Sequence, residues 1–459
     1  MEMLNKFEEV FFYLLLFSIP FQRRIILWQQ NWYFNEWQSI SVYATDLLLV
    51  SLFVFWLFNN RPLFKFLVLN KPINLKNSKS DLFLILFLII AGISIKNGES
   101  FVFGFFSWLK LVEFVLFYFY LKKYAIDRFS LSYSFLAIFA GGLFQALIAV
   151  GQFLKQSSLD LGLQIFGEGF LRPEVNGVAV FLNNSGQKIM RAYGTTPHPN
   201  ILAGYLFLAI FSFYAWYWYN KIQLSRNIEL SLLAVYGVIV FALMTTFSRT
   251  VMFVFVLGMV LRFGLNLFQG RIRKKFIHSE HLKIKMTNIA TTTLIVMGIF
   301  TVVFWPEVKS RALLSLHDEA VVLRIYYNKE ALGTSINWFG VGLGNFVNWF
   351  MVNDPYRPKW FYQPVHNIYL LVYSETGLAG IAAFGLFLIL LIKEFIQKTK
   401  LKGMPEYSIL LMVLSFLFIG IFDHYLITLQ QGKFIFWLTL AMLNISYIEK
   451  IQKEIGGRN

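Results

Sequence analysis

Residues 366–392 read HNIYLLVYSETGLAGIAAFGLFLILLI, in which an apolar run from Ile368 to Ile392 follows directly on a histidine and an asparagine. A run of about 20 apolar residues is long enough to cross the hydrocarbon core of a bilayer as a helix. His366 therefore lies at the end of a predicted membrane span, where Asn367 can cap the first helical turn. A long polar and aromatic connection, residues 306–365, precedes it.

The composition of the whole chain is that of a membrane protein. Of its 459 residues, 57% are hydrophobic and only 14% are charged, whereas a soluble domain carries about 25% charged residues. Such a chain cannot cover a water-facing surface with polar groups, which excludes a soluble globular protein. The lysines and arginines behind the formal charge of +16 lie mostly between apolar runs. We interpret them as loop charges of a membrane protein and expect no nucleic-acid partner.

Apolar length and periodicity predict an all-α, polytopic helix bundle of about twelve spans, formed by residues 1–459 as a single membrane domain. The predicted spans are Phe7–Phe21, Ile40–Phe58, Asp81–Ile95, Phe101–Leu121, Phe129–Phe153, Ile201–Tyr219, Glu229–Phe247, Val251–Phe268, Asn288–Trp305, Ile368–Ile392, Tyr407–Phe422 and Phe434–Ile448. An even number places both ends of the chain on one side. The connections on that side hold about 25 of the 41 lysines and arginines, so the positive-inside rule predicts cytoplasmic N- and C-termini.

This topology places two long connections on the outer face, residues 155–200 and residues 306–366. Loops longer than about 12–15 residues are usually functional or disordered, and the aromatic content of both argues against disorder. Within the second loop, residues 318–332 have helical spacing of the apolar residues Ala320, Leu323, Tyr327 and Ala331. We expect an amphipathic helix there, ended by Gly333, that presents Arg324 over the outer face of the membrane.

Three arginines are predicted at the outer ends of spans. Arg191 begins the segment RAYGTTPHPN (191–200), Arg249 lies in the minimal connection between two spans, and Arg324 lies on the amphipathic helix. Guanidinium groups bind phosphate through two parallel hydrogen bonds, so three of them together would suit a pyrophosphate. For Arg249 the alternative is that its side chain extends to lipid headgroups.

His366 is a candidate general base, because an imidazole with a pKa near 6.5 can take a hydroxyl proton at neutral pH. Tyr369 is expected to share its helix face, whereas Glu375 falls on the opposite face. Glu375 is therefore expected to orient another group or to pair with an arginine of a neighbouring helix. His198 lies between two prolines, which suits either a site residue or a purely structural turn.

Two further features have ordinary structural interpretations. Residues 340–344 (GVGLG) lack the strand–turn–helix context of a phosphate loop, so we expect a tight turn. Lys110 and Glu113 lie three residues apart within a predicted span, where a self-neutralising ion pair is expected and a proton relay is the alternative. His, Asp and Glu show no spacing typical of a metal site, so no metal is predicted.

Taken together, the motifs resemble the O-antigen ligase/polymerase superfamily of bacterial envelope enzymes. The resemblance rests on Arg191 to Asn200 with the following ILAG, Ser248-Arg249, Arg324, G-x-GNF from Gly342 to Phe346, and HN-x-YL from His366 with Glu375-x-Gly377. The resemblance is good over roughly residues 190–390, whereas the first half of the chain matches only in its pattern of spans.

The resemblance implies a glycosyltransferase in the bacterial cytoplasmic (inner) membrane, with its site facing the periplasm and with no metal, nucleotide or other cofactor. Its donor would be a glycan on undecaprenyl pyrophosphate, and its acceptor another glycan or lipid A-core. Arg191, Arg249 and Arg324 would hold the diphosphate and His366 would act on the acceptor hydroxyl, with inversion. The substrate-binding residues would include Arg191, His198, Asn200, Asn345, Asn367, Tyr369 and Glu375.

Other functions remain open from the residues alone. A transporter or flippase of lipid-linked sugars is the main alternative, although a transporter usually places its charges near the bilayer midplane. A structural envelope protein is a third. Ligase, polymerase and protein O-glycosyltransferase are not separable by these residues. If the transferase prediction is right, the three arginines and His366 should line one outward-opening cavity.

Overall fold

The computed structural model describes residues 2–32, 34–59, 78–219, 225–272, 280–312, 319–334, 337–401, 404–444 and 449–450. The protein is mostly helical, at 73%. The long helices are α1 (Glu2–Ser18), α2 (Ala44–Asn59), α4 (Lys79–Ser94), α5 (Phe101–Tyr120), α7 (Leu131–Lys155), α8 (Pro199–Tyr219), α9 (Arg226–Thr245), α10 (Arg249–Ile272), α11 (Glu280–Val303), α15 (Ile368–Thr399), α16 (Met404–Ile419) and α18 (Gln430–Ala441).

Shorter elements connect these helices. They are the helices α6 (Ile126–Arg128), α12 (Trp305–Ala312), α13 (Glu319–Gly333), α14 (Phe346–Asn353) and α17 (Tyr425–Thr428), and the strands β1 (Arg24–Gln29), β2 (Ser39–Tyr43), β3 (Val180–Leu182) and β4 (Lys188–Met190). The strands form two antiparallel hairpins, β1–β2 and β3–β4, which the all-α prediction did not include.

Seven helices among the described residues are long and apolar enough to cross a membrane. They are Lys79–Asn97, Phe101–Arg128, Leu131–Lys155, Pro199–Tyr217, Arg226–Thr245, Lys283–Val303 and Ile368–Thr399. Ala44–Asn59, Arg249–Leu261 and Pro405–Ile419 are shorter apolar helices. Every predicted span therefore overlaps a helix, and several spans are confirmed as helices of membrane length. The total of twelve spans stays a prediction, because seven described helices meet the length and apolarity of a membrane span.

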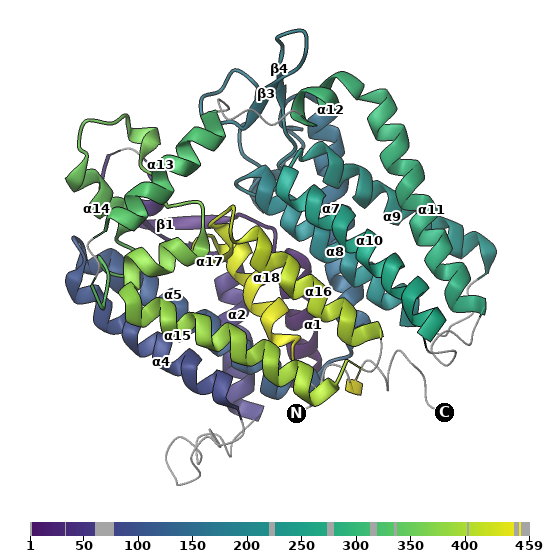
Figure 1. Cartoon of the computed structure of the whole chain (residues 1–459), viewed down its shortest axis with the longest axis horizontal. Helices are drawn as coiled ribbons and strands as arrows, with labels where there is room; N and C mark the ends of the chain where they lie inside the picture. The colour runs from purple at the N-terminus through teal and green to yellow at the C-terminus, as the bar shows by residue number, and fades with distance from the viewer. Residues whose placement is uncertain are drawn as a thin grey trace.

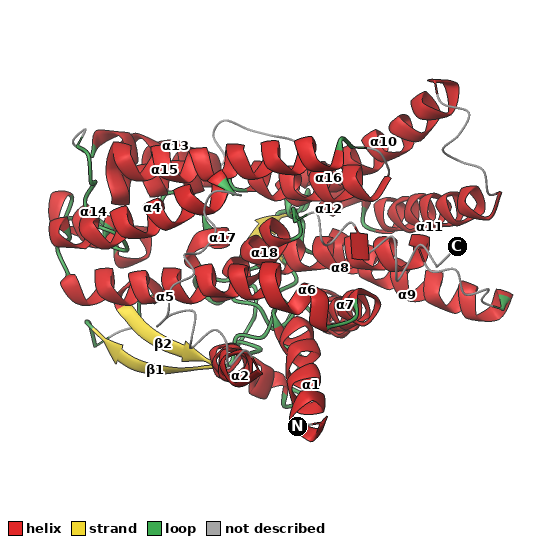
Figure 2. Cartoon of the chain, turned by 90° about the horizontal axis from the view of Figure 1, so that it is seen from below, coloured by secondary structure: helices red, strands yellow, loops and turns green. Residues whose placement is uncertain are grey.

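The helices form two groups that share α18. In Figure 1, α4, α5 and α15 lie on one side of the molecule and α7 to α11 on the other. Figure 2 shows the same division from below. Helix α4 packs along α15, α7 packs against α8 and α9, and α18 contacts both α5 and α8. The hairpin β3–β4 and helices α12 and α13 lie toward the top of Figure 1, at the end where residues 155–200 and 306–366 gather.

Close packing of α7 on α8 depends on small residues. A Cβ at Gly142 would lie 2.4 Å from the Cβ of Ala209, and one at Gly141 would lie 2.2 Å from the Tyr205 hydroxyl oxygen. In a bilayer the lipid tails are as apolar as the side chains, so helices associate by contact and hydrogen bonding, and small residues let their backbones approach. These glycines therefore set the distance between the two helices.

The second predicted span needs a correction at its start. Residues 40–43 belong to strand β2, and the helix begins at Ala44 rather than at Ile40. The Asp46 carboxylate accepts a hydrogen bond from the backbone N–H of Tyr43 at 2.9 Å, which holds the junction between strand and helix. Apolar length alone did not separate a strand ending at the membrane surface from the span that follows it.

The amphipathic helix of the second long connection is confirmed as α13. Its apolar residues Tyr327 and Ala331 are buried in a second hydrophobic cluster with Phe346, Phe350 and Phe361. That cluster is separate from the core of the helix bundle. Helix α13 is therefore anchored by its apolar face to α14 and to the segment that leads into α15.

The first and last described segments lie at the same end of the bundle. Arg128 pairs with Glu8 of α1 at 2.9 Å. The Lys450 ammonium donates a hydrogen bond to the carbonyl oxygen of Ile126 at 2.5 Å. An even number of membrane crossings would likewise place both terminal segments at one end of the bundle.

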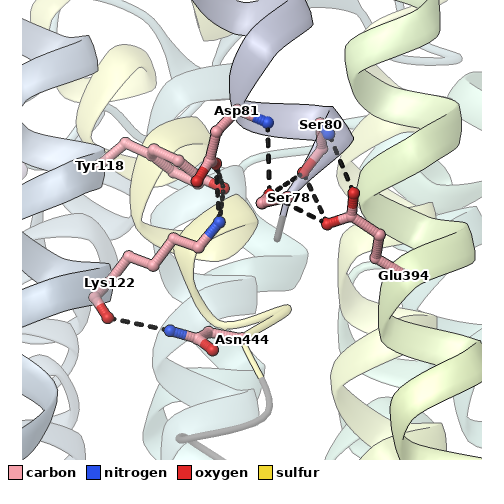
Figure 3. Close-up of polar contacts among 7 residues, drawn as sticks. All are labelled: Ser78, Ser80, Asp81, Tyr118, Lys122, Glu394 and Asn444. Carbon is pink, nitrogen blue, oxygen red and sulfur yellow. Dashed lines mark hydrogen bonds and ion pairs between the residues drawn. The ribbon is translucent and has the colours of Figure 1, made fainter. Parts of the chain in front are cut away.

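A polar network joins three helices at the beginning of α4, as Figure 3 shows. The Glu394 carboxylate of α15 accepts hydrogen bonds from the Ser80 backbone N–H and hydroxyl, both at 2.9 Å, and from the Ser78 hydroxyl at 3.1 Å. Lys122 pairs with Asp81 at 2.7 Å. Backbone N–H groups in the first turn of a helix have no partner within the helix. At the start of α4, the carboxylate of Glu394 from a neighbouring helix accepts such a hydrogen bond, which is a favourable arrangement.

Replacing Glu394 with alanine should destabilise the protein by about 1–2 kcal/mol, because three hydrogen bonds to a partly exposed carboxylate are lost. The exposed Lys398 one turn later is the matched control, and its alanine variant should change stability by less than about 0.5 kcal/mol. Thermal unfolding in detergent, followed by tryptophan fluorescence, compares the two. Equal melting temperatures would show that the network contributes nothing to stability.

Candidate functional site

The loop that precedes α8 is fixed by two buried glutamines of α7. Gln152 Oε1 accepts hydrogen bonds from the backbone N–H groups of Tyr193 at 3.1 Å and Gly194 at 2.8 Å. Gln145 Oε1 accepts one from the N–H of Thr195 at 2.8 Å. Buried backbone donors need such partners. The conformation of this loop, and with it the place of Arg191, is therefore set by α7.

Arg191 connects three separate parts of the chain. Its Nε donates a hydrogen bond to the carbonyl oxygen of Thr246 at 2.7 Å, and a terminal nitrogen donates to Asn200 Oδ1 at 2.6 Å. The Asn200 amide in turn donates to the Asp423 carboxylate at 2.7 Å. The loop before α8, the end of α9 and the segment between α16 and α17 thus meet at one arginine, whose side chain is buried.

Arg249 lies at the start of α10, after the minimal turn that the sequence predicts. Helix α9 ends at Thr245 and α10 begins at Arg249. The Nε of Arg249 donates a hydrogen bond to the carbonyl oxygen of Arg311 at 2.8 Å. The Arg311 guanidinium lies over the ring of Phe181, 5.5 Å from its centroid. Arg249 is thereby positioned at the end of α12, close to a fourth arginine.

Helix α13 positions both Arg324 and His366. The Nε of Arg324 is buried and has no hydrogen-bond partner among the described residues. One turn further along α13, the Tyr327 ring stacks on the His366 imidazole, with 5.7 Å between centroids and 15° between planes. The Tyr327 hydroxyl donates to the carbonyl oxygen of Phe361 at 2.6 Å, which fixes the ring on which the imidazole lies.

His366 belongs to a group of three histidines around Asp423. Its ring contacts that of His424 at 4.8 Å between centroids, and its buried Nδ1 has no hydrogen-bond partner among the described residues. His424 Nδ1 is 2.8 Å from the Thr428 hydroxyl. His198 Nδ1 accepts the backbone N–H of Asn200 at 3.1 Å. The Nδ1 of His366 is thus the one left available among these three imidazoles.

Burial decides the protonation of these histidines. It lowers the pKa values of His198 and His424 to about 3. Burial also lowers the pKa of His366, where the carboxylate of Asp423 opposes the effect and Arg324 adds to it. For Asp423, burial favours the neutral form, but His424, His366 and His198 outweigh it and hold its pKa at about 2. At neutral pH the group therefore contains neutral imidazoles and one ionised carboxylate.

The arginines make this region electropositive. Burial lowers the pKa of Arg191 to about 9, with the like charges of Arg311 and Arg324 contributing and Asp423 opposing. Arg191 still carries its proton at neutral pH, so its guanidinium group is repelled by those of Arg311 and Arg324. An anion placed among them would relieve this repulsion and gain charge-assisted hydrogen bonds.

Asn345 and Glu375 lie apart from this group and hold a loop. The loop of residues 340–344 docks on α15, where the backbone N–H groups of Val341 and Gly342 donate to the carbonyl oxygens of Ser374 and Glu375. Glu375 Oε1 accepts the N–H of Phe346 at 3.4 Å. Asn345 is fully buried and bonds to the backbone of Ser100. The expected tight turn is confirmed. Of the two alternatives for Glu375, its contacts fit the orientation of another group.

The docking of this loop requires a break in α15. Gly377 has φ 70° and ψ −166° within the helix. A Cβ there would lie 2.4 Å from the backbone nitrogen of Phe339. Only glycine combines this conformation with such a close approach. The break bends α15 directly after the segment that carries His366, Asn367 and Glu375.

Asn367 and Tyr369 have structural contacts. The Asn367 side chain caps α15 by accepting the N–H groups of Tyr369 and Leu370 at 2.9 and 3.1 Å, as the sequence predicts. The Tyr369 hydroxyl donates to the carbonyl oxygen of Leu417 at 2.9 Å. Tyr369 is thereby directed to α16.

A partly open cavity lies beside this group, between β2, α5, α15, α17 and α18. Its lining includes Trp37, Pro364 and Thr428 but not His366 or the three arginines. This cavity is therefore not the shared one that the sequence predicts, and a cavity lined by the three arginines and His366 stays a prediction. Arg191 nevertheless interacts electrostatically with Arg311 and Arg324, and Arg324 with His366, although these residues are far apart in the sequence.

The sequence interpretation assigned no site role to four residues of this region. Arg311 lies in a short helix without a motif, and Tyr327 was noted only as a neighbour of Arg324 on the amphipathic helix. Asp423 and His424 are adjacent titratable residues before the last predicted span, a signal that was visible but had no assigned role. The ion pair of Lys110 and Glu113 is confirmed at 2.8 Å, and Asp46 joins it at 2.7 Å.

Residues 232–385, about a third of the chain, match the family model described as O-antigen ligase. No curated protein sequence matches the chain. The family match supports the predicted resemblance to the O-antigen ligase/polymerase superfamily. Together with the apolar helices it supports a bacterial multi-pass membrane protein of a glycosyltransferase-type enzyme family. The matched region contains Arg249, Arg324 and His366, whereas Arg191, His198 and Asn200 precede it.

Proposed function

We propose that the chain transfers a glycan from undecaprenyl pyrophosphate to a hydroxyl group of a glycan or lipid A-core acceptor, on the outer face of the bacterial inner membrane. The observation that carries the proposal is the coupling of Arg191, Arg311 and Arg324 beside the free Nδ1 of His366. A diphosphate is the kind of anion that such a group of guanidinium groups would hold.

In the reaction we infer, the acceptor hydroxyl oxygen attacks the anomeric carbon of the donor sugar from the face opposite the diphosphate. The bond between that carbon and the phosphate oxygen breaks, and the lipid pyrophosphate leaves with the electron pair. His366 takes the hydroxyl proton, and the arginines stabilise the negative charge that develops on the leaving group. The configuration at the anomeric carbon inverts. In this reaction the base is the imidazole of His366, and the groups that bind the diphosphate are guanidinium groups.

The proposed orientation has both termini in the cytoplasm, and it places residues 155–200 and 306–366 in the periplasm. It rests on the distribution of lysine and arginine along the sequence and agrees with the gathering of both connections at one end of the bundle. Lys110 and Glu113, the main exception to the placement of charges at the outer ends of spans, form a mutually paired cluster with Asp46. That pairing favours the transferase.

The rate of transfer should depend on pH through His366. Burial lowers its pKa from 6.5, so the neutral base persists below that pH and is lost only as the pH falls through the lowered value. We expect a flat rate between about pH 7.5 and 6.5 and an acidic limb with its midpoint below the unperturbed 6.5. A pH–rate profile under saturating donor measures it, and a midpoint well above 6.5 would contradict the assignment.

The proposed function is tested with purified protein in liposomes, supplied with an undecaprenyl-pyrophosphate-linked oligosaccharide and candidate acceptors. We expect a longer or ligated glycan and free undecaprenyl pyrophosphate in equal amounts. Movement of the intact donor across the bilayer without release of pyrophosphate lipid would instead indicate a transporter.

A further inference from the structure

The cavity near His366 has a lining that is both polar and aromatic. It encloses about 180 Å³, which is room for roughly a dozen water molecules and enough for one hexose ring. Strand β2 supplies one wall, because alternate residues of a strand face the same side and Ser39, Ser41 and Tyr43 all line the cavity. Helix α18 supplies Gln430, Lys433 and Trp437.

Polar atoms in this wall lack partners. The Ser41 hydroxyl and Gln430 Oε1 are buried and form no hydrogen bond within the described chain. Lys433, which is partly exposed, lines the same cavity. Buried polar atoms are almost always satisfied in folded proteins, so two unsatisfied ones at one cavity, beside an ammonium group, indicate a ligand that supplies both donors and acceptors.

The remaining lining fits the same chemistry. The Glu375 carboxylate lines the cavity together with Lys433, and the rings of Trp37 and Trp437 form part of its surface. Sugar hydroxyl groups both donate and accept hydrogen bonds, whereas the C–H faces of a sugar ring pack on aromatic side chains. A lipid chain would satisfy the apolar part of the lining alone and leave Ser41 and Gln430 without partners.

The cavity is connected to the proposed base through His424. Thr428 lines it, and the Thr428 hydroxyl is 2.8 Å from His424 Nδ1. The Trp37 ring, which also lines it, contacts the His424 ring at 5.2 Å between centroids. His424 in turn contacts His366. One layer of side chains therefore separates the cavity from the imidazole of His366.

We propose that this cavity, through Ser41, Gln430 and Lys433, binds a sugar residue of the acceptor glycan and presents the adjoining hydroxyl group to His366. This inference rests on the proposed function and adds to it a binding site for the acceptor, separate from the arginines that hold the donor. Selection among acceptors would then be made by β2 and α18.

The test uses full-length protein without donor. Tryptophan fluorescence is titrated with a panel of methyl glycosides, since Trp37 and Trp437 line the cavity. Wild type should show saturable quenching with at least one glycoside. Ser41→Ala should weaken that binding about three- to tenfold, because one hydrogen bond to an otherwise unpartnered hydroxyl is lost. Lys433→Met should weaken it about ten- to a hundredfold, because the lost bond is charge-assisted. The control Gln397→Leu, on an exposed part of α15, should bind as wild type does.

A second arm measures transfer. Ser41→Ala should raise the KM for the acceptor and leave the KM for the donor unchanged. Because the wild-type Ser41 hydroxyl has no partner, this variant keeps every internal hydrogen bond, and misfolding does not explain its effect. Unaltered glycoside binding in both Ser41→Ala and Lys433→Met would overturn the proposal, as would quenching by a prenyl alcohol and by none of the glycosides. Saturable sugar binding without any transfer would instead refute the transferase function and leave the sugar site standing.

Discussion

Replacing His366 with alanine should lower the turnover number about 10²–10⁴-fold, which is the usual contribution of a general base. The KM for the lipid-linked donor should change little, because the arginines rather than the imidazole are assigned to the diphosphate. The structural reason is the free, buried Nδ1 of a neutral imidazole held against Tyr327. Turnover is measured as released undecaprenyl pyrophosphate under saturating donor and acceptor.

Gln363 provides the matched control for this variant. It lies three residues earlier in the same segment, and its amide donates only to the carbonyl oxygen of Trp360. Gln363→Ala should keep turnover within about twofold of wild type, as expected for a partly exposed residue outside the site. If His366→Ala kept more than a tenth of the wild-type turnover, His366 would not be the base.

The second large effect is expected for Arg324. Its alanine variant should lose about 10²–10³-fold in turnover, which is typical when one donor to a developing negative charge is removed. Arg324→Lys should recover only part of the loss, because lysine keeps the charge but lacks the planar pair of donors. Lys329→Ala, an exposed change on the same helix, is the control and should be active.

Arg324 also has an effect that a merely structural residue would not produce. Its charge lowers the pKa of His366, so its removal should raise that pKa and move the acidic limb of the pH–rate profile to higher pH. If Arg324→Ala kept full turnover and an unchanged acidic limb of the pH–rate profile, Arg324 would neither bind the diphosphate nor act on the base.

Much of the fold follows from local sequence properties. Apolar length located a helix in every predicted span, and the spacing of Leu323, Tyr327 and Ala331 identified α13. Strand β2 could not be predicted in the same way, because residues 40–43 are as apolar as the helix they precede. Pairing with β1 depends on contacts between separated residues, and these leave no periodic signal in so short a segment.

The site was less predictable, because it is assembled from distant loops. The residue types of Arg191, Arg249, Arg324 and His366 identified the region. The position of the cavity could not be predicted, since its lining comes from β2, α5, α15, α17 and α18, which are far apart in the sequence. Arg311 had no sequence signal, because it is brought near Arg191 only by the position of α12. Likewise, the roles of Asn345 and Glu375 as anchors of the loop 340–344 depend on the break in α15 at Gly377.

The account depends on guanidinium groups from separate segments holding a diphosphate beside an imidazole. The most direct measurement is a cryo-EM structure of the protein in nanodiscs with undecaprenyl pyrophosphate bound. We predict that both phosphate groups lie within hydrogen-bonding distance of guanidinium nitrogens of Arg191, Arg249 or Arg324, on the side of the bundle where His366 is found. Phosphate density at the opposite end of the bundle, near Glu394 and Lys122, or out of reach of these arginines would contradict it.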